Sequence, residues 1–324
     1  MRHSIFTHRR LDALRNVLVL GAVRTPIGSL NGVFSSVRAV ELAVLAAKET
    51  LRRSGAEAGQ VEEAVFGNVL QAGLGQNPAR QILLGAGIPE DRPAFTLNKV
   101  CGSGLKAIEL GWQSILLGRA NVVLAGGAEN MTQAPYLLPA MRAGARMGDT
   151  KAVDGMIYDG LWEIFNNYHM GITAENVAEK YGISREEQDL FAYQSQMKYA
   201  KALERGVLHE EIVPVTVRQK KGEVVVDRDE HPKPDTSMEK MAKLRPAFRP
   251  DGTVTAANAS GVNDGAAAVL LAAEDALPAN LNTEGAVYLR DVRSNGCSPA
   301  LMGLGPIGAV RKLLEKNGLT AADI

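Results

Sequence analysis

The chain is poor in cysteine, in net charge and in aromatic residues, and each shortage argues against a class of protein. Its 324 residues include only two cysteines, Cys101 and Cys297, so neither a disulfide framework nor a cysteine zinc cluster can be built. Lys and Arg together number 36, as do Asp and Glu, which gives no global bias toward nucleic acid or an anionic membrane. Aromatic residues make up 5%, which does not favour platforms that stack bases.

Long apolar runs are also missing, and none approaches the roughly 18 residues of a membrane span. The first segment, residues 1–15, is basic, and we interpret it as a short extension, with a mitochondrial leader as the alternative. The scarcity of cysteine is typical of a reducing compartment, so we expect a cytoplasmic protein. The length fits two domains, or one large domain with an insertion.

The first part of the chain alternates between strand and helix patterns. Buried strand patterns occupy 16–26, 61–70 and 120–129, and helix patterns occupy 39–55 and 78–87. Gly55 is a helix stop signal. Such an alternation predicts an α/β fold with a mainly parallel sheet that is covered by helices.

The composition changes from about 131 to 261, where Met, Tyr and charged residues are more frequent. One helix is clear in this segment, because Ser184 and Glu187 form a capping-box pattern. A buried strand at 266–273 then restores the apolar character of the first part, and a strand at 286–292 and a helix at 307–318 open another unit. We therefore predict four segments: an extension at 1–15, an N-terminal domain at 16–130 plus 262–283, an inserted loop domain at 131–261, and the start of a C-terminal domain at 284–324.

Cys101 stands in "NKVCGSGLKAIELGWQSILLG", at the start of a long apolar helix pattern. A helix N-terminus favours the thiolate, which is the nucleophilic form of cysteine. Gly102 and Gly104 keep side chains away from the sulfur, so an acyl group could approach and backbone N–H groups could face an oxyanion. Spacing alone leaves a buried, inert cysteine as the alternative.

A reactive cysteine needs a base, and the chain has five histidines: His3, His8, His169, His209 and His231. His169, in "NNYHMGITAEN", lies between an aromatic patch and a helix start, which makes a substrate-facing role plausible. The others fall in the extension or in polar segments and favour a surface position. Cys297 lies in a loop without a helix start that could activate it, and we interpret it as a cysteine without a catalytic role.

The sequence argues against a nucleotide-binding motif and against a metal site. "GLGPIG" at 303–308 matches G-x-G-x-x-G by letter, but its strand ends too early and Pro306 occupies the turn. No acidic residue follows at the distance that a dinucleotide site needs. P-loop and zinc-ligand spacings do not occur, so we predict no metal.

Taken together, the segments resemble the thiolase family, the acyl-CoA acetyltransferases that make or cleave 3-ketoacyl-CoA. The resemblance runs from Val17 to Ile324. Its motifs are "AVRTPIG", "GQNPARQ", "NKVCGSGLKAI", "AGGAENM", "HMGITAEN", "SREEQD", "KLRPAF", "GTVTAANASGVNDGAAA" and "MGLGPIGAVRK". The family implies two similar layered α/β/α halves, with a loop domain inserted in the first half.

The resemblance also implies a reaction and a set of site residues. A cysteine takes an acyl group from one CoA thioester, and free CoA or the enolate of acetyl-CoA then removes it. Cys101 matches the acylated cysteine, His169 a loop-domain residue that faces substrate and CoA, and Ser260 a residue that contacts the pantetheine arm. The other matches to the CoA tunnel are Leu161, Phe248, Ala256 and Met302.

The family further implies that CoA is a substrate, that no cofactor is needed, and that the full-length protein is a homo-oligomer (dimer or tetramer) without nucleic-acid or membrane partners. His169 followed by Met170 is similar to the short-chain members, which favours acetoacetyl-CoA and a role in fatty acid metabolism. Lys233 and Lys240 fall near the phosphate-binding face, where the family varies.

Three family segments do not occur in the sequence: an "NEAF" segment, a "GHP" segment and a late "C-x-G". The resemblance therefore implies a C-terminally truncated thiolase with an incomplete second half. Proton transfer contributes about 10²–10⁴ in rate, so Cys101 is expected to be acylated slowly in this chain and not to turn over. The alternatives are an active enzyme whose sequence continues beyond Ile324, an inactive acyl-CoA-binding remnant, and a subunit completed by a partner chain.

Overall fold

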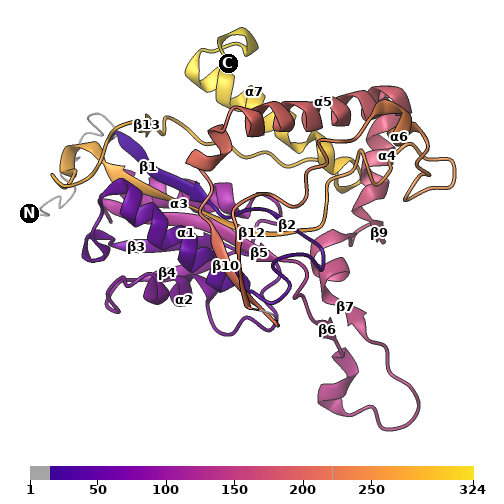
Figure 1. Cartoon of the computed structure of the whole chain (residues 1–324), viewed down its shortest axis with the longest axis horizontal. Helices are drawn as coiled ribbons and strands as arrows, with labels where there is room; N and C mark the ends of the chain where they lie inside the picture. Colours follow the sequence, from indigo (N-terminus) through magenta and orange to yellow (C-terminus); the bar gives the residue numbers. More distant parts are fainter. Residues whose placement is uncertain (1–14, 221) are drawn as a thin grey trace, which may run out of the picture.

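The computed structural model describes residues 15–220 and 222–324, and a seven-stranded sheet forms its centre (Figure 1). The strands of this sheet are β1 (Val17–Arg24), β2 (Gly28–Ser29), β3 (Glu63–Gly67), β4 (Ala94–Leu97), β5 (Val122–Asn130), β12 (Asn263–Ala273) and β13 (Val287–Tyr288). Their order is β13–β1–β12–β5–β3–β4, and β2 pairs with β12.

Helices cover both faces of this sheet because its central strands are apolar on both sides. Helices α1 (Ala39–Ser54) and α2 (Pro78–Gly85) share one buried cluster with Leu124 and Leu270 of the sheet. Helix α3 (Ser103–Leu116) shares a second cluster with Val123 and Leu271, which neighbour those two residues along their strands. Successive side chains of a strand point to opposite faces, so the expected layered α/β/α arrangement is confirmed.

The expectation of a mainly parallel sheet was wrong. In the described sheet the parallel pairs are β3–β4 and β3–β5. β12 pairs antiparallel with β1, β2 and β5, and β13 pairs antiparallel with β1. The alternation along the first part of the chain did not reveal that β12, which comes more than 130 residues after β5, inserts between β1 and β5.

The local signals for helix ends were reliable. α1 ends where Gly55 adopts φ +70°, the left-handed conformation that favours glycine. Helix α5 (Arg185–Glu204) begins at Ser184, whose hydroxyl accepts a hydrogen bond from the Glu187 amide in a complete capping box. Both predictions from the sequence are confirmed.

Between β5 and β12 the chain forms small hairpins and helices. The strands and α-helices are β6 (Tyr136–Leu137), β7 (Val153–Asp154), β8 (Trp162–Glu163), β9 (Tyr168–His169), α4 (Met170–Tyr181), α5, β10 (Val215–Gln219), β11 (Gly222–Val226) and α6 (Met238–Ala242). The β10–β11 hairpin returns to the core, because Val215 and Val217 are buried in the cluster that contains α1.

After β12 the predicted strand at 286–292 is limited to the two residues of β13, and the predicted helix forms as α7 (Gly305–Asn317). The four segment boundaries stay a prediction. The extension falls largely on residues 1–14, which lie outside the described residues. Among the described residues no helix is both long and apolar enough to cross a membrane.

Arg24, at the end of β1, ties the segment between β5 and β12 to the central sheet. Its Nη1 and Nη2 donate to the two carboxylate oxygens of Asp229 at 2.7 and 2.9 Å, and its Nε donates to Glu211 at 2.8 Å. The Asp229 side chain is 3% exposed. Burial by itself would raise the pKa of Asp229, but the hydrogen bonds from Arg24 and from the Ile27 amide outweigh burial and lower that pKa.

Replacing Arg24 by methionine is expected to lower the free energy of unfolding by about 3 kcal/mol, because Asp229 would remain buried without its cation. Urea unfolding measures this change. The control is Arg52→Met, which removes a surface pair with Glu49 and is expected to leave the unfolding midpoint unchanged. Equal losses in the two variants would contradict the assignment of Arg24 as a buried anchor.

Candidate active site

Cys101 lies in a tight turn between β4 and α3, immediately before Gly102, the N-cap of α3. The thiol is exposed, so the alternative of a buried, inert cysteine does not hold. The Gly102 amide donates to the Lys99 carbonyl at 3.0 Å, and the Ser103 amide donates to the Val100 carbonyl at 3.0 Å. These bonds close the turn that presents the sulfur at the start of the helix.

The turn is held in a conformation that its residues do not favour by themselves. Val100 has φ +47°, the left-handed region in which a β-branched residue is strained. Asn98 accepts a hydrogen bond from the Val100 amide at 2.8 Å. The Ser103 hydroxyl donates to the Val100 carbonyl at 2.6 Å and accepts from the Lys99 amide at 2.8 Å. Side chains on both sides of Cys101 therefore fix its backbone.

The start of α3 lies directly against two strands because glycine occupies the contact positions. A Cβ atom built on Gly67, the last residue of β3, would lie 2.6 Å from the Ser103 carbonyl carbon and 2.8 Å from the Gly104 nitrogen. On Gly127 of β5, a Cβ atom would lie 3.4 Å from the Gly104 Cα. A side chain at position 67 would therefore push the helix, and Cys101 with it, away from the sheet.

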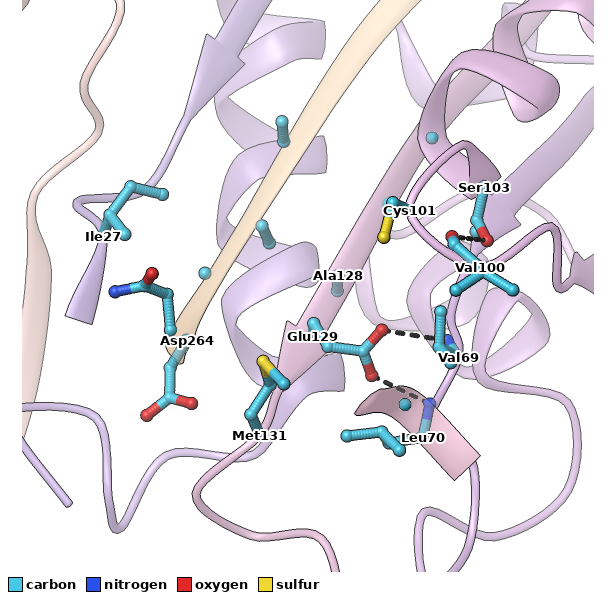
Figure 2. Close-up of a pocket in the computed structure, with 18 of the residues that line it drawn as sticks. Ile27, Val69, Leu70, Val100, Cys101, Ser103, Ala128, Glu129, Met131 and Asp264 are labelled. Atoms are coloured by element: carbon cyan, nitrogen blue, oxygen red, sulfur yellow. Dashed lines mark hydrogen bonds between the residues drawn. The ribbon is translucent and has the colours of Figure 1, made fainter. Parts of the chain in front are cut away.

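Cys101 lines a cavity of about 520 Å³ whose walls come from the turn, from the ends of β3 and β5, and from β12. Figure 2 shows its sulfur pointing into this space. Gly104 also lines the cavity, and a Cβ atom built there would meet nothing within 4 Å. The expectation that this glycine leaves room beside the sulfur is therefore consistent with the geometry.

Two acidic residues line the same cavity, Glu129 from β5 and Asp264 from β12 (Figure 2). Burial raises the pKa of each, although hydrogen bonds to the carboxylates act in the opposite direction. Asp264 accepts from the Thr132 amide at 3.1 Å and from the Thr132 hydroxyl at 2.7 Å. Among the described residues, no histidine lines this cavity.

His169 lies in a second cavity of about 820 Å³, which we call the outer cavity to distinguish it from the inner cavity that contains Cys101. It is the N-cap of α4, where its Nδ1 accepts from the Gly171 amide at 3.0 Å, so the ring proton of the neutral form is on Nε2. The ring stacks on Phe248 with centroids 4.8 Å apart. Burial lowers the pKa of His169, which favours the neutral imidazole.

The two cavities share a boundary formed by Leu161, Ser260 and Gly261, which line both. His169, Phe248 and Met302 line the outer cavity alone. Most of the residues predicted from the resemblance are therefore brought together along one path that leads to Cys101. Ala256 is exposed and is not among the residues lining either cavity.

The remaining residues singled out from the sequence fall outside this path. Lys233 and Lys240 are both exposed, and neither lines either cavity. Cys297 is exposed in a loop, with its sulfur 3.7 Å from the Met302 carbonyl oxygen. His231, expected at the surface, is half-buried, and its imidazole lies against Gly261. His3 and His8 lie outside the described residues.

Sequence reasoning missed the polar residues of the inner cavity, above all Glu129. A signal was present, because Glu129 is the one charged residue in the apolar strand "VVLAGGAEN" of β5. A carboxylate at the end of a buried strand needs hydrogen-bond partners. The sequence did not reveal that these partners come from the turn after β3.

The strain at Val100 gives a testable ranking of two variants. Glycine normally costs about 0.5–1 kcal/mol relative to alanine in regular structure. At φ +47° the order should reverse, so Val100→Gly is expected to be about 1 kcal/mol more stable than Val100→Ala. Val100 is 42% exposed, so both variants lose little packing. Urea unfolding of the pair measures the difference, and a more stable alanine variant would rule out the strained turn.

The lowered pKa of His169 predicts a pH dependence of stability. Below the unfolded pKa of about 6.5, the unfolded chain binds more protons than the native chain, so His169 lowers stability as pH falls. Asparagine at this position can still cap α4 without titrating. The melting temperature of His169→Asn is therefore expected to fall less than that of the wild type between about pH 7.5 and 5.5, measured by circular dichroism. Parallel curves would contradict a neutral, half-buried imidazole.

Comparisons with known proteins agree with this geometry. Residues 17–275 match the family model described as "Thiolase, N-terminal domain". A probable acetyl-CoA acyltransferase of Staphylococcus aureus is 50% identical over 312 residues, which are 96% of this chain and 79% of that protein. An acetyl-CoA acetyltransferase of Pseudomonas aeruginosa is 52% identical over 306 residues, 94% and 78% of the two chains. The solved acetyl-CoA acetyltransferase of Syntrophomonas wolfei superposes with a TM-score of 0.90 at 42% identity, covering 96% of this chain and 78% of that one. The chain belongs to the thiolase family.

Proposed function

We propose that the protein is an acyl-CoA acyltransferase that works through an acyl-cysteine at Cys101. One observation carries this proposal. The exposed thiol of Cys101 lies in a cavity at a helix start, and this cavity shares Leu161, Ser260 and Gly261 with the outer cavity. A long, narrow ligand such as a pantetheine arm would fit this path, with its thioester at the sulfur and its nucleotide end outside. CoA is then a substrate, and the reaction needs no cofactor or metal.

In the proposed first step the Cys101 sulfur attacks the carbonyl carbon of an acyl-CoA. A new carbon–sulfur bond forms, the bond to the CoA sulfur breaks, and CoA leaves with the proton that Cys101 gave up. In the second step the sulfur of free CoA, or the enolate carbon of acetyl-CoA, bonds to the acyl carbon and the bond to the Cys101 sulfur breaks. The released thiolate takes up the proton that the attacking CoA thiol, or the acetyl group on forming its enolate, gave up. The neutral His169 would donate through its Nε2–H to a polar group of the ligand in the outer cavity.

We propose short acyl groups, with acetoacetyl-CoA favoured, as substrates in fatty acid metabolism. Two observations support this choice. Met170 joins His169 in the wall of the outer cavity, and the relatives described above are named for acetyl-CoA. We further propose a cytoplasmic homo-oligomer without nucleic-acid or membrane partners. In support, β4 lies at a free edge of the described sheet with Phe95 37% exposed, next to the "GQNPARQ" segment.

The proposal predicts that acetyl-CoA acetylates the protein at one position. Mass spectrometry of the peptides after incubation with acetyl-CoA should place the acetyl group on Cys101. Cys101→Ser is expected to lower the rate of acetylation by about 10⁴-fold or more, because the hydroxyl is not ionised at neutral pH. Cys297→Ser is the matched control and should be acetylated at the wild-type rate.

Acetylation of Cys297 in place of Cys101, or no acetylation at either, would overturn the proposal. The same samples, supplied with acetoacetyl-CoA and CoA, distinguish repeated turnover from a single acylation. Repeated turnover supports the full acyltransferase. A single acylation favours the acyl-accepting half-reaction alone. In support of that outcome, no histidine that could act as a base is found among the described residues that line the inner cavity.

A further inference from the structure

Helix α4, which follows directly on β9 (Figure 1), presents one side to the outer cavity, and Asn176 lies beside that side. The residues of α4 that line the cavity at the spacing of one helix face are Met170, Thr173, Ala174 and Val177. Asn176 is half-buried and is not among the residues that line either cavity. The proposed reaction gives Asn176 no part, yet its side chain reaches three other segments of the chain.

The side-chain amide of Asn176 makes three hydrogen bonds. Its Oδ1 accepts from the Arg249 Nη2 at 2.6 Å, and its Nδ2 donates to the Ala300 carbonyl at 3.0 Å and to the Tyr168 hydroxyl at 3.3 Å. These partners fix the orientation of the amide, because a guanidinium only donates and a carbonyl only accepts. Arg249 also donates through its Nη1 to Glu179, one turn further along α4, at 3.0 Å. Both arms of the guanidinium are therefore bound to α4.

Each of these three partners is one or two residues away in the chain from a residue that lines the outer cavity. For Tyr168, Arg249 and Ala300 the lining neighbours are, in the same order, His169, Phe248 and Met302. The bonds from Asn176 to Arg249 and to Ala300 join residues that are 73 and 124 positions apart. Chain connectivity therefore does not bring Phe248 and Met302 to α4, whereas the side chain of Asn176 ties their segments to it.

The walls of the outer cavity also contact α4 directly. The ring of His169, the N-cap of α4, stacks on Phe248, and a Cβ atom built on Gly171 would overlap the Phe248 ring. A Cβ atom built on Gly303 would lie 3.8 Å from Val177 Cγ2. Apolar contacts of this kind are not directional. The hydrogen bonds of Asn176 add a directional constraint on where each wall lies along the helix.

We propose that Asn176 is a positioning residue that holds His169, Phe248 and Met302 in one arrangement, so that the walls of the outer cavity are ordered before a ligand enters. A site with ordered walls loses less conformational freedom when its ligand binds, and it therefore binds more tightly. The identity of the ligand rests on the proposed function, in which the outer cavity takes the pantetheine arm of CoA. The hold of Asn176 on the three walls does not depend on that function.

The first test replaces Asn176 by alanine, which removes the three hydrogen bonds and is a better helix former than asparagine. Isothermal titration calorimetry measures the dissociation constant for CoA. In Asn176→Ala this constant is expected to rise about 10-fold, because CoA must then order the walls as it binds. Cys101 should still react with iodoacetamide at the wild-type rate, since its turn has hydrogen bonds of its own. An unchanged dissociation constant would overturn the proposal.

Asn121→Ala is the matched control. Asn121 is also a half-buried asparagine that joins distant segments, because its Oδ1 accepts from Arg15 Nη2 at 2.8 Å and its Nδ2 donates to Glu62 at 3.1 Å. It lines neither cavity, so this variant should bind CoA as the wild type does. An equal loss of affinity in Asn121→Ala and Asn176→Ala would reveal a general effect on the fold and would rule out a specific role for Asn176.

Hydrogen–deuterium exchange tests the hold on the walls without any ligand. In Asn176→Ala the peptides that contain residues 168–171, 247–249 and 299–303 are expected to exchange faster than in the wild type. The internal reference is the peptide with Thr253 and Val254, whose amides donate to Glu175 of the same helix and should keep their rate. Unchanged exchange in the three segments contradicts the proposal. If the wild-type protein binds no CoA, the proposed function fails and this exchange still decides the role of Asn176.

Asn176→Asp separates the three bonds, and it keeps the proposal testable where the alanine variant does not fold. The new carboxylate still accepts from Arg249, and the Tyr168 hydroxyl can turn to donate to it, but it offers no donor to the Ala300 carbonyl. Exchange should therefore rise only in the peptide that contains Ala300, and the dissociation constant for CoA should lie between those of the wild type and Asn176→Ala. Faster exchange at all three partners would count against the proposal, because a generally weakened helix would loosen every wall alike.

Discussion

The close approach of a helix to two strands is the constraint on which the site depends. The first residues of α3 lie in contact with the ends of β3 and β5, and Gly67 and Gly127 make that approach possible by having no side chain. The sulfur of Cys101 is then placed by backbone atoms, which are less mobile than side chains. The strain at Val100 follows from the same constraint, because the chain must turn from β4 into α3 within a few residues.

The segment between β5 and β12 matters to the site because it supplies the outer walls, while the core sheet supplies the nucleophile. Ser260 and Gly261 come just before β12, so the strand that completes the centre of the sheet also carries the boundary between the two cavities. The Arg24–Asp229 pair attaches the same segment to β1. The packing of the core and the alignment of the cavity walls therefore depend on the same strands. Because close-packed interiors transmit strain, a change in the core packing would shift the cavity walls, and a change in the walls would disturb the core.

The sequence predicted the elements of this framework better than their assembly. Gly55 and the Ser184–Glu187 capping box act over a few residues, so the helix ends that they mark could be read from the chain. The place of β12 between β1 and β5 depends on contacts more than 100 residues apart, which periodicity does not encode. For the site, the residues around Cys101 and His169 were found through motifs. The place of Glu129 in the site was missed, because the partners that it finds at positions 68–70 look like ordinary loop residues.

The electrostatic field in the inner cavity depends on the hydrogen bonds and ion pairs that its charged side chains make. Glu129 and Asp264 line this cavity, and each accepts hydrogen bonds from neutral donors of the surrounding loops, which stabilise its charged form. Arg24 reaches the cavity wall, yet its guanidinium is shared between Asp229 and Glu211. The backbone dipoles at the start of α3 add a fixed contribution to the field at the Cys101 sulfur, and this contribution favours negative charge there. Such dipoles are fixed by the fold and need no reorganisation when charge develops on a reacting thioester, so the glycine contacts that hold α3 against the sheet also fix the polarity of the site.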